Sequence, residues 1–137
     1  NLSNLSTTNS TLYNIAKRYA IENGYDDCII LNDQKNLAET IKGSLYLLQK
    51  DKIFTSTLKC GCQDFVLRSA FNEWLKNKQK LFELIEKEIS PFELQKSNEL
   101  MVLSLMYGGQ GVSHYRRSTY ISNQLKKLFN SFIRDLY

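Results

Sequence analysis

Two residues of this sequence could support chemistry through their side chains, Glu39 and His114. Glu39 lies between Ala38 and Thr40 in a segment typical of a strand, and its neighbours predict partial burial. A buried carboxylate is unfavourable unless it is paired with a charge or hydrogen-bonded. Glu39 is therefore a candidate functional residue, with a rim carboxylate facing water as the alternative. His114, the only histidine, is expected to be an ordinary structural residue.

The three cysteines form neither a disulfide framework nor a complete metal site. Cys60 and Cys62 make a C-x-C pair, but structural zinc needs four ligands and the sequence offers few partners. We therefore expect no metal. The odd count, with Cys28 as the third cysteine, favours a reducing compartment and hence a cytoplasmic protein.

The composition is that of an ordinary globular domain. The chain has 137 residues, of which 42% are hydrophobic and 23% charged, and this length fits one domain. No apolar run approaches about 18 residues, so we expect no transmembrane helix and no membrane partner. The net charge is +4, but basic residues mostly alternate with acidic ones, which argues against a nucleic-acid partner. The sequence lacks a Walker loop and the G-x-G-x-x-G, H-E-x-x-H and G-x-S-x-G motifs.

Hydrophobic periodicity predicts an α/β fold of successive hairpins with flanking helices. Helical spacing of apolar residues predicts helices over residues 12–20, 66–75 and 121–136, and Ser90-Pro91 predicts the start of a short one. Shorter apolar runs predict strands over residues 27–31, 37–40, 44–49, 53–57, 100–105 and 112–115. Residues 81–89 fit a strand or a helix, and we choose a strand. Gly108 and Gly109 are expected to interrupt the sheet.

Several segments occur in an order typical of one enzyme family. They are residues 24–32, 37–40, 44–47, 51–55, 61–62, 66–68 and 99–102. Taken in this order, they resemble the C-terminal domain of the class IV aminotransferases, which include branched-chain and D-amino acid aminotransferases and 4-amino-4-deoxychorismate lyase. Residues 111–115 are most similar to the lyase-like members. The resemblance covers nearly the whole chain, 1–137, and implies the C-terminal half of fold type IV: a mixed, partly closed sheet with flanking helices. The resemblance also implies that the family's N-terminal domain is absent from this chain.

The resemblance also implies which residues would bind pyridoxal phosphate, the cofactor of the family. Glu39 matches the carboxylate that pairs with the pyridine nitrogen and keeps it protonated. The backbone N–H groups of Val66 and Leu67 match the phosphate loop, and Ser104 keeps one hydroxyl of the second phosphate contact. Ser6 falls where the family has the lysine that binds the cofactor covalently. Because a hydroxyl cannot form an imine, the resemblance identifies no catalytic residue in this chain.

Further departures from the family pattern fall on the same site. Phe65 replaces the glycine before the phosphate loop, Asp64 adds a negative charge beside the phosphate position, and leucines flank Ser104. We interpret the chain as a non-catalytic aminotransferase- or lyase-like domain with a degraded site, acting as a homodimer or with the missing N-terminal domain. One alternative is a working lyase or aminotransferase, completed by that domain or by a lysine supplied differently. The other is a partner-binding scaffold that uses the basic closing helix.

Overall fold

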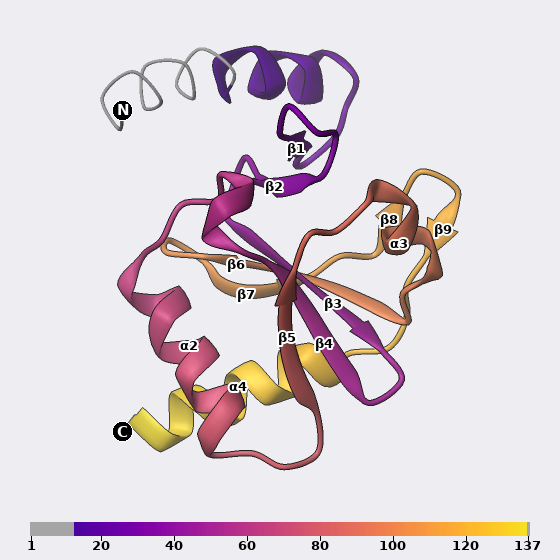
Figure 1. Ribbon diagram of the computed structural model, residues 1–137. Coiled ribbons are helices and arrows are strands. Elements are labelled where there is room, and N and C mark those ends of the chain that lie inside the picture. Colours follow the sequence, from indigo (N-terminus) through magenta and orange to yellow (C-terminus); the bar gives the residue numbers. More distant parts are fainter. Residues whose placement is uncertain (1–12, 137) are drawn as a thin grey trace.

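A mixed five-stranded sheet is the centre of the fold (Figure 1). The computed structural model describes residues 13–136 of the chain. The strands of this sheet are β3 (Ser44–Gln49), β4 (Lys52–Ser56), β5 (Glu83–Lys87), β6 (Glu99–Ser104) and β7 (Gly108–Gly111). They lie in the order β5-β4-β3-β6-β7, and only β4 and β5 pair in parallel.

Two short hairpins lie outside this sheet. β1 (Ile29–Leu31) pairs with β2 (Leu37–Thr40), and β8 (His114–Tyr115) pairs with β9 (Ser118–Thr119). A first helix, described over residues 13–22, lies beyond β1 and β2, so the β1–β2 hairpin sits between this helix and the large sheet (Figure 1). Glu39, in β2, is therefore carried by a hairpin of its own and not by the main sheet.

Both faces of the large sheet are covered, which explains why its central strands are almost continuously apolar. Adjacent residues of a strand point to opposite faces, so Tyr46 and Leu47 of β3 belong to different cores. The first core lies under the helices α2 (Val66–Asn77) and α4 (Gln124–Leu136) and includes Phe71, Trp74, Met101, Phe129 and Phe132. The second core includes Leu37, Ile89, Leu94, Leu100 and Tyr120.

The short helices α3 (Pro91–Lys96) and η1 (Leu58–Cys60) complete the set of elements. At α3 the predicted start is confirmed: the Ser90 hydroxyl accepts a hydrogen bond from the Phe92 N–H, and the Glu93 carboxylate accepts one from the Ser90 N–H. The strand chosen for residues 81–89 is also confirmed as β5. None of the helices in the described part of the chain has the length and apolar character needed to span a bilayer.

The predicted interruption of the sheet at Gly108 and Gly109 is wrong, because both residues lie inside β7. A Cβ atom at Gly109 would lie 2.9 Å from Cγ of Phe129 and 3.0 Å from Sδ of Met101. The glycines therefore let α4 lie directly on this strand. Gly108 also has a positive φ of 69°, directly after the turn at residues 105–107.

The predicted end of the sheet also needs correction. Residues 112–115 do not continue it, since the chain leaves the sheet after the Val112 N–H bonds to the Leu100 carbonyl, and His114 begins the separate β8–β9 hairpin. β6 ends at Ser104 and leaves Leu105 exposed. The closing helix begins at Gln124, not at Ile121, which is 98% exposed.

Candidate functional site

Glu39 is a buried carboxylate, as its strand-like surroundings predict. It is 4% exposed and every residue of β2 is buried, so the alternative of a rim carboxylate is wrong. β2 pairs with β1 through Ile30 and Glu39. The Gln63 N–H donates a hydrogen bond to Oε1 of Glu39, with an N···O distance of 3.0 Å. This bond fixes the carboxylate against the segment that leads from β4 into α2.

Burial opposes the ionisation of Glu39, and two neighbouring groups favour it. Burial raises the pKa of the Glu39 carboxyl from 4.5 to about 7, while the Gln63 hydrogen bond and the Arg68 guanidinium act to lower it. Burial likewise raises the pKa of the Cys62 thiol. The positive charge of Arg68 acts to lower this pKa, and the negative charge of Glu39 acts to raise it. Glu39, Cys62 and Arg68 thus form one electrostatic cluster between β2 and α2.

The N-terminus of α2 lies at the other end of the same segment. Phe65 is the N-cap residue, in an extended conformation, and its side chain caps no backbone N–H. Val66 is the first helical residue, with Leu67 next. Free N–H groups at such an end, together with the helix dipole, favour an anion. The N–H groups of Val66 and Leu67 therefore lie at a helix end of the kind that can bind an anion.

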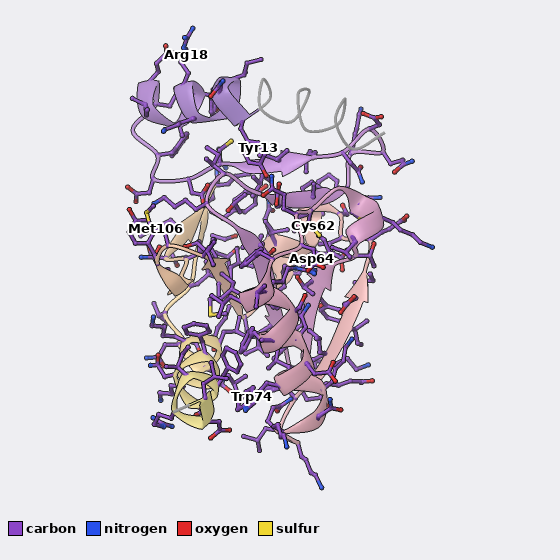
Figure 2. The ribbon with its side chains drawn as sticks, turned by 90° about the vertical axis from the view of Figure 1, so that its left-hand side faces the viewer. Tyr13, Arg18, Cys62, Asp64, Trp74 and Met106 are labelled. Carbon is purple, nitrogen blue, oxygen red and sulfur yellow. The ribbon has the colours of Figure 1, made fainter. Side chains whose placement is uncertain are left out.

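The surroundings of these donors are negative. Asp64 and Glu73 line the shallow hollow at this end of α2, together with Phe65, Val66 and Ser69. Oδ1 of Asp64 accepts a hydrogen bond from the Ser69 hydroxyl at 2.8 Å, which holds the carboxylate beside the first turn. Figure 2 shows Asp64 next to Cys62 on the segment that enters α2, with Trp74 further along this helix. A carboxylate of the chain itself thus lies beside the N-terminus of α2.

Ser104 is buried at the end of β6, where its hydroxyl accepts a hydrogen bond from the Tyr107 N–H at 2.8 Å. The turn after β2 comes close to this strand end, because a Cβ atom at Gly43 would lie only 2.0 Å from the Leu103 carbonyl oxygen. Ser104 therefore lies near the turn that follows β2. Its hydroxyl, however, is hydrogen-bonded to the turn that follows β6.

The other candidate residues contribute no further site. Ser6 lies outside the described residues. His114 is exposed and pairs with the Ser113 hydroxyl. Cys60 and Cys62 are buried free thiols, and within residues 13–136 no group of three or more potential ligands could hold a metal ion.

Comparison with known proteins identifies the family. The family model for amino-transferase class IV matches residues 1–115. The chain belongs to this family. Among curated proteins, no relative matches the chain.

Solved structures of class IV members share the fold. An aminotransferase from Brucella abortus, bound to pyridoxal phosphate, superimposes with a TM-score of 0.82 at 12% identity, over 90% of this chain and 44% of its own. A putative branched-chain aminotransferase from Thermotoga maritima gives 0.78 at 18% identity, over 88% and 44%. A putative 4-amino-4-deoxychorismate lyase from Legionella pneumophila gives 0.77 at 18% identity, over 88% and 45%.

These matches confirm the expected fold class, a mixed α/β domain like the C-terminal domain of fold type IV aminotransferases. The chain spans less than half the length of the solved structures that it matches. The likeness to them therefore concerns one part of a larger architecture.

The described residues fit pyridoxal phosphate at one end only. Glu39 offers a buried carboxylate for the ring nitrogen, and ring-nitrogen protonation is what makes the cofactor an electron sink. At the other end, Val66 begins α2, and the Asp64 carboxylate and the Phe65 side chain line the same hollow as Val66. A phosphate would have to be bound at this end by backbone N–H groups.

Arg68 lies in the segment 66–68 that resembles the family motif, but the sequence alone predicts no role for it. Arg68 shares the buried face of α2 with Phe71, Asn72 and Leu75. Arg68 precedes Phe71 by three residues and Asn72 by four, and this spacing predicts that all three lie on the same face of the helix. A charged residue on an apolar helix face calls for a specific partner.

Proposed function

We propose that this chain is a class IV aminotransferase- or lyase-like domain whose pyridoxal phosphate site is degraded, and that it is not catalytic. The observation that carries the proposal is the Asp64 carboxylate held beside the N-terminus of α2 by Ser69. A phosphate dianion placed on the N–H groups of Val66 and Leu67 would be repelled by it. Phe65 adds bulk where a glycine would allow close approach of the backbone.

The energetic effect of these changes is large enough to abolish useful affinity. Charge-assisted hydrogen bonds to a phosphate contribute ~1.5–3 kcal/mol each. Losing two or three of them weakens binding by several orders of magnitude. The absence of a lysine at Ser6 would remove the covalent attachment as well. The retained burial of Glu39 then reflects the inherited fold and not a bound cofactor.

We propose further that the domain works within a larger assembly, as a homodimer or beside an N-terminal domain. Its matches cover about 44% of the neighbouring chains, which is consistent with such a partner. The three free thiols are consistent with a reducing, cytoplasmic location.

Reductive trapping tests the proposal. The purified protein is incubated with pyridoxal phosphate, treated with borohydride, digested and examined by mass spectrometry. We expect no pyridoxyl adduct on a specific lysine and no new absorbance band in the visible region. A stoichiometric adduct on any single lysine of the chain would overturn the proposal.

A matched pair of variants isolates the phosphate end. Ser6→Lys supplies an amine, and we expect it to bind pyridoxal phosphate only weakly in a spectroscopic titration. Adding Asp64→Ala and Phe65→Gly should tighten binding markedly, because the repulsion and the crowding are removed together. If Ser6→Lys alone binds at micromolar levels, the phosphate end is intact and this account of it is wrong.

A working pyridoxal phosphate enzyme is the second candidate, and the burial of Glu39 beside Arg68 favours it. In that case the missing lysine and part of the site come from elsewhere in the complete protein. The trapping experiment, repeated on the longest available form of the protein, separates the two candidates.

A further inference from the structure

Arg68 is a buried cation at the centre of the cluster around Glu39. It projects from the first turn of α2 and is 3% exposed. Within residues 13–136 the ion pairs are Lys76–Glu86 and Lys87–Glu93, and Arg68 takes part in neither. Its Nε is buried without a hydrogen-bond partner. A desolvated guanidinium in this state needs a compensating negative charge nearby.

The position of Arg68 is fixed by a short chain of hydrogen bonds that ends at β2. Nη2 of Arg68 donates to the Ser56 carbonyl at 2.6 Å. The Ser56 hydroxyl donates in turn to the Leu37 carbonyl at 2.8 Å. Leu37 is two residues before Glu39 on the same strand, so Arg68 connects α2 through the end of β4 to the strand that carries the carboxylate.

Three buried titratable groups interact electrostatically with the guanidinium: Glu39 from β2, Cys62 from the segment before α2, and Tyr46 from β3. The Tyr46 hydroxyl donates to Oδ1 of Asn72, and the Cys62 thiol donates to the Thr57 carbonyl. Burial raises the pKa of both groups, so both stay neutral near pH 7. Glu39 is the one of the three that can supply the missing negative charge.

We propose that Arg68 is the positioning residue of Glu39: it ties β2 to α2 through Ser56 and keeps the buried carboxyl able to ionise. The role belongs to the folded chain alone. It rests on the placement of Glu39 and not on whether a cofactor binds, so its test is separate from that of the proposed function.

The first test measures the titration of Glu39 itself. The carboxyl carbon of Glu39 is followed by carbon-13 NMR against pH, with the signal assigned by its loss in Glu39→Gln. Arg68→Met removes the charge, Arg68→Lys keeps it, and Arg134→Met, at an exposed site on α4, is the matched control. We expect Arg68→Met to raise the midpoint by about one pH unit or more, Arg68→Lys to restore most of the shift, and the control to change nothing. A folded Arg68→Met protein with an unchanged Glu39 midpoint would overturn the proposal.

A second measurement uses the unmodified protein, because Arg68→Met also removes the hydrogen bond to the Ser56 carbonyl. The nitrogen-15 and proton signals of the Arg68 Nε–H group report the charge state of nearby groups. We expect them to shift with pH at the same midpoint as Glu39, and to be constant over that range in Glu39→Gln. A pH-independent Arg68 signal in the unmodified protein would refute the coupling without any substitution at Arg68.

Discussion

At the scale of single residues, the burial of Glu39 links the stability of the fold to pH. A carboxyl whose pKa rises from 4.5 to about 7 on folding binds its proton more tightly in the folded state. The resulting stability is fully present below about pH 4.5 and is lost as the pH rises through about 7. Burial of the charged form, which is the main cause, therefore works against the fold at pH 8.

We predict that Glu39→Gln is more stable than the unmodified protein at pH 8 and similar to it at pH 5. The amide cannot ionise, so the substitution removes the penalty that burial places on the carboxylate. The shift in pKa sets an upper limit of about 3 kcal/mol on the gain. Urea unfolding at the two pH values measures it.

Glu88→Gln, at an exposed position beyond β5, is the control for that experiment. It should leave the pH dependence of stability unchanged, since water screens an exposed carboxylate. If Glu39→Gln and the unmodified protein are equally stable at pH 8, the prediction is wrong. The interactions of the carboxylate would then fully offset the free-energy cost of burying its charge.

The sequence predicted the buried carboxylate but not the cation beside it. Glu39 was found because its neighbours form a strand-like apolar run. Arg68 was read as part of a motif, and its inward orientation depends on the helix phase of α2 together with the Ser56 carbonyl, which is twelve residues away. Contacts of this kind arise from tertiary packing, which local periodicity does not encode.

At the scale of elements, the close approach of two chain segments makes Gly43 indispensable. A Cβ atom there would lie 2.0 Å from the carbonyl oxygen of Leu103 and 2.8 Å from its carbonyl carbon, both of which belong to β6. We predict that Gly43→Ala destabilises the protein by about 3 kcal/mol or more, at the upper end for single substitutions. Thermal unfolding measures the loss.

The matched control is Gly111→Ala, because no atom lies within 4 Å of a Cβ built at Gly111. It should change stability by at most about 0.5 kcal/mol. Similar losses for the two variants would mean that the backbone at Gly43 moves aside freely.

A second element-scale prediction concerns the start of α4. The buried Glu99 carboxylate accepts hydrogen bonds from the N–H groups of Gln124 at 2.9 Å and Leu125 at 2.8 Å, and from the Ser122 hydroxyl. Glu99→Ala removes all three bonds and leaves the buried Leu125 N–H unsatisfied, so we predict a loss of about 2–3 kcal/mol in the free energy of unfolding. Glu99→Gln keeps one acceptor oxygen and should lose less, whereas equal losses would show that the negative charge matters more than the hydrogen bonds.

Elements defined by local signals were predicted well, and elements defined by packing were not. The β3–β4 hairpin, α2 and the capped start of α3 follow from apolar periodicity and from Ser90-Pro91. The prediction failed at β7, because two glycines there serve contact with Phe129. It failed again at the start of α4, which is set by Glu99 from a distant strand.

At the scale of the whole molecule, several large apolar side chains remain in contact with water. Leu105, Met106 and Tyr107 follow one another after β6 and are 73%, 79% and 57% exposed. Figure 2 shows Met106 at the left-hand side of the view, away from Asp64 near its centre. Ile15 and Tyr19 are also exposed, one turn apart on the first helix. Consecutive exposed apolar residues are typical of surfaces that contact another protein.

We predict that the purified protein self-associates in sedimentation velocity experiments and that Leu105→Ser with Met106→Gln weakens the association. Exposed side chains contribute little to the fold, so the double variant should unfold at the same urea concentration as the unmodified protein. A monomer at every concentration tested would contradict the prediction.

The β1–β2 hairpin has its own two-stranded sheet. Its backbone is joined to the main body at Leu37, whose N–H bonds to the Ile89 carbonyl and whose carbonyl accepts a hydrogen bond from the Ser56 hydroxyl. Amide hydrogens of β2 should therefore exchange with solvent deuterium through openings that leave β3 and β6 intact. They should exchange sooner than the amide hydrogens of β3 and β6.

Because such an opening returns Glu39 to water, ionisation of Glu39 favours the open state. Exchange of the β2 amides should accelerate above pH 7 by more than hydroxide catalysis explains, and in Glu39→Gln it should follow hydroxide alone. The buried carboxylate would then set how often this corner of the protein opens.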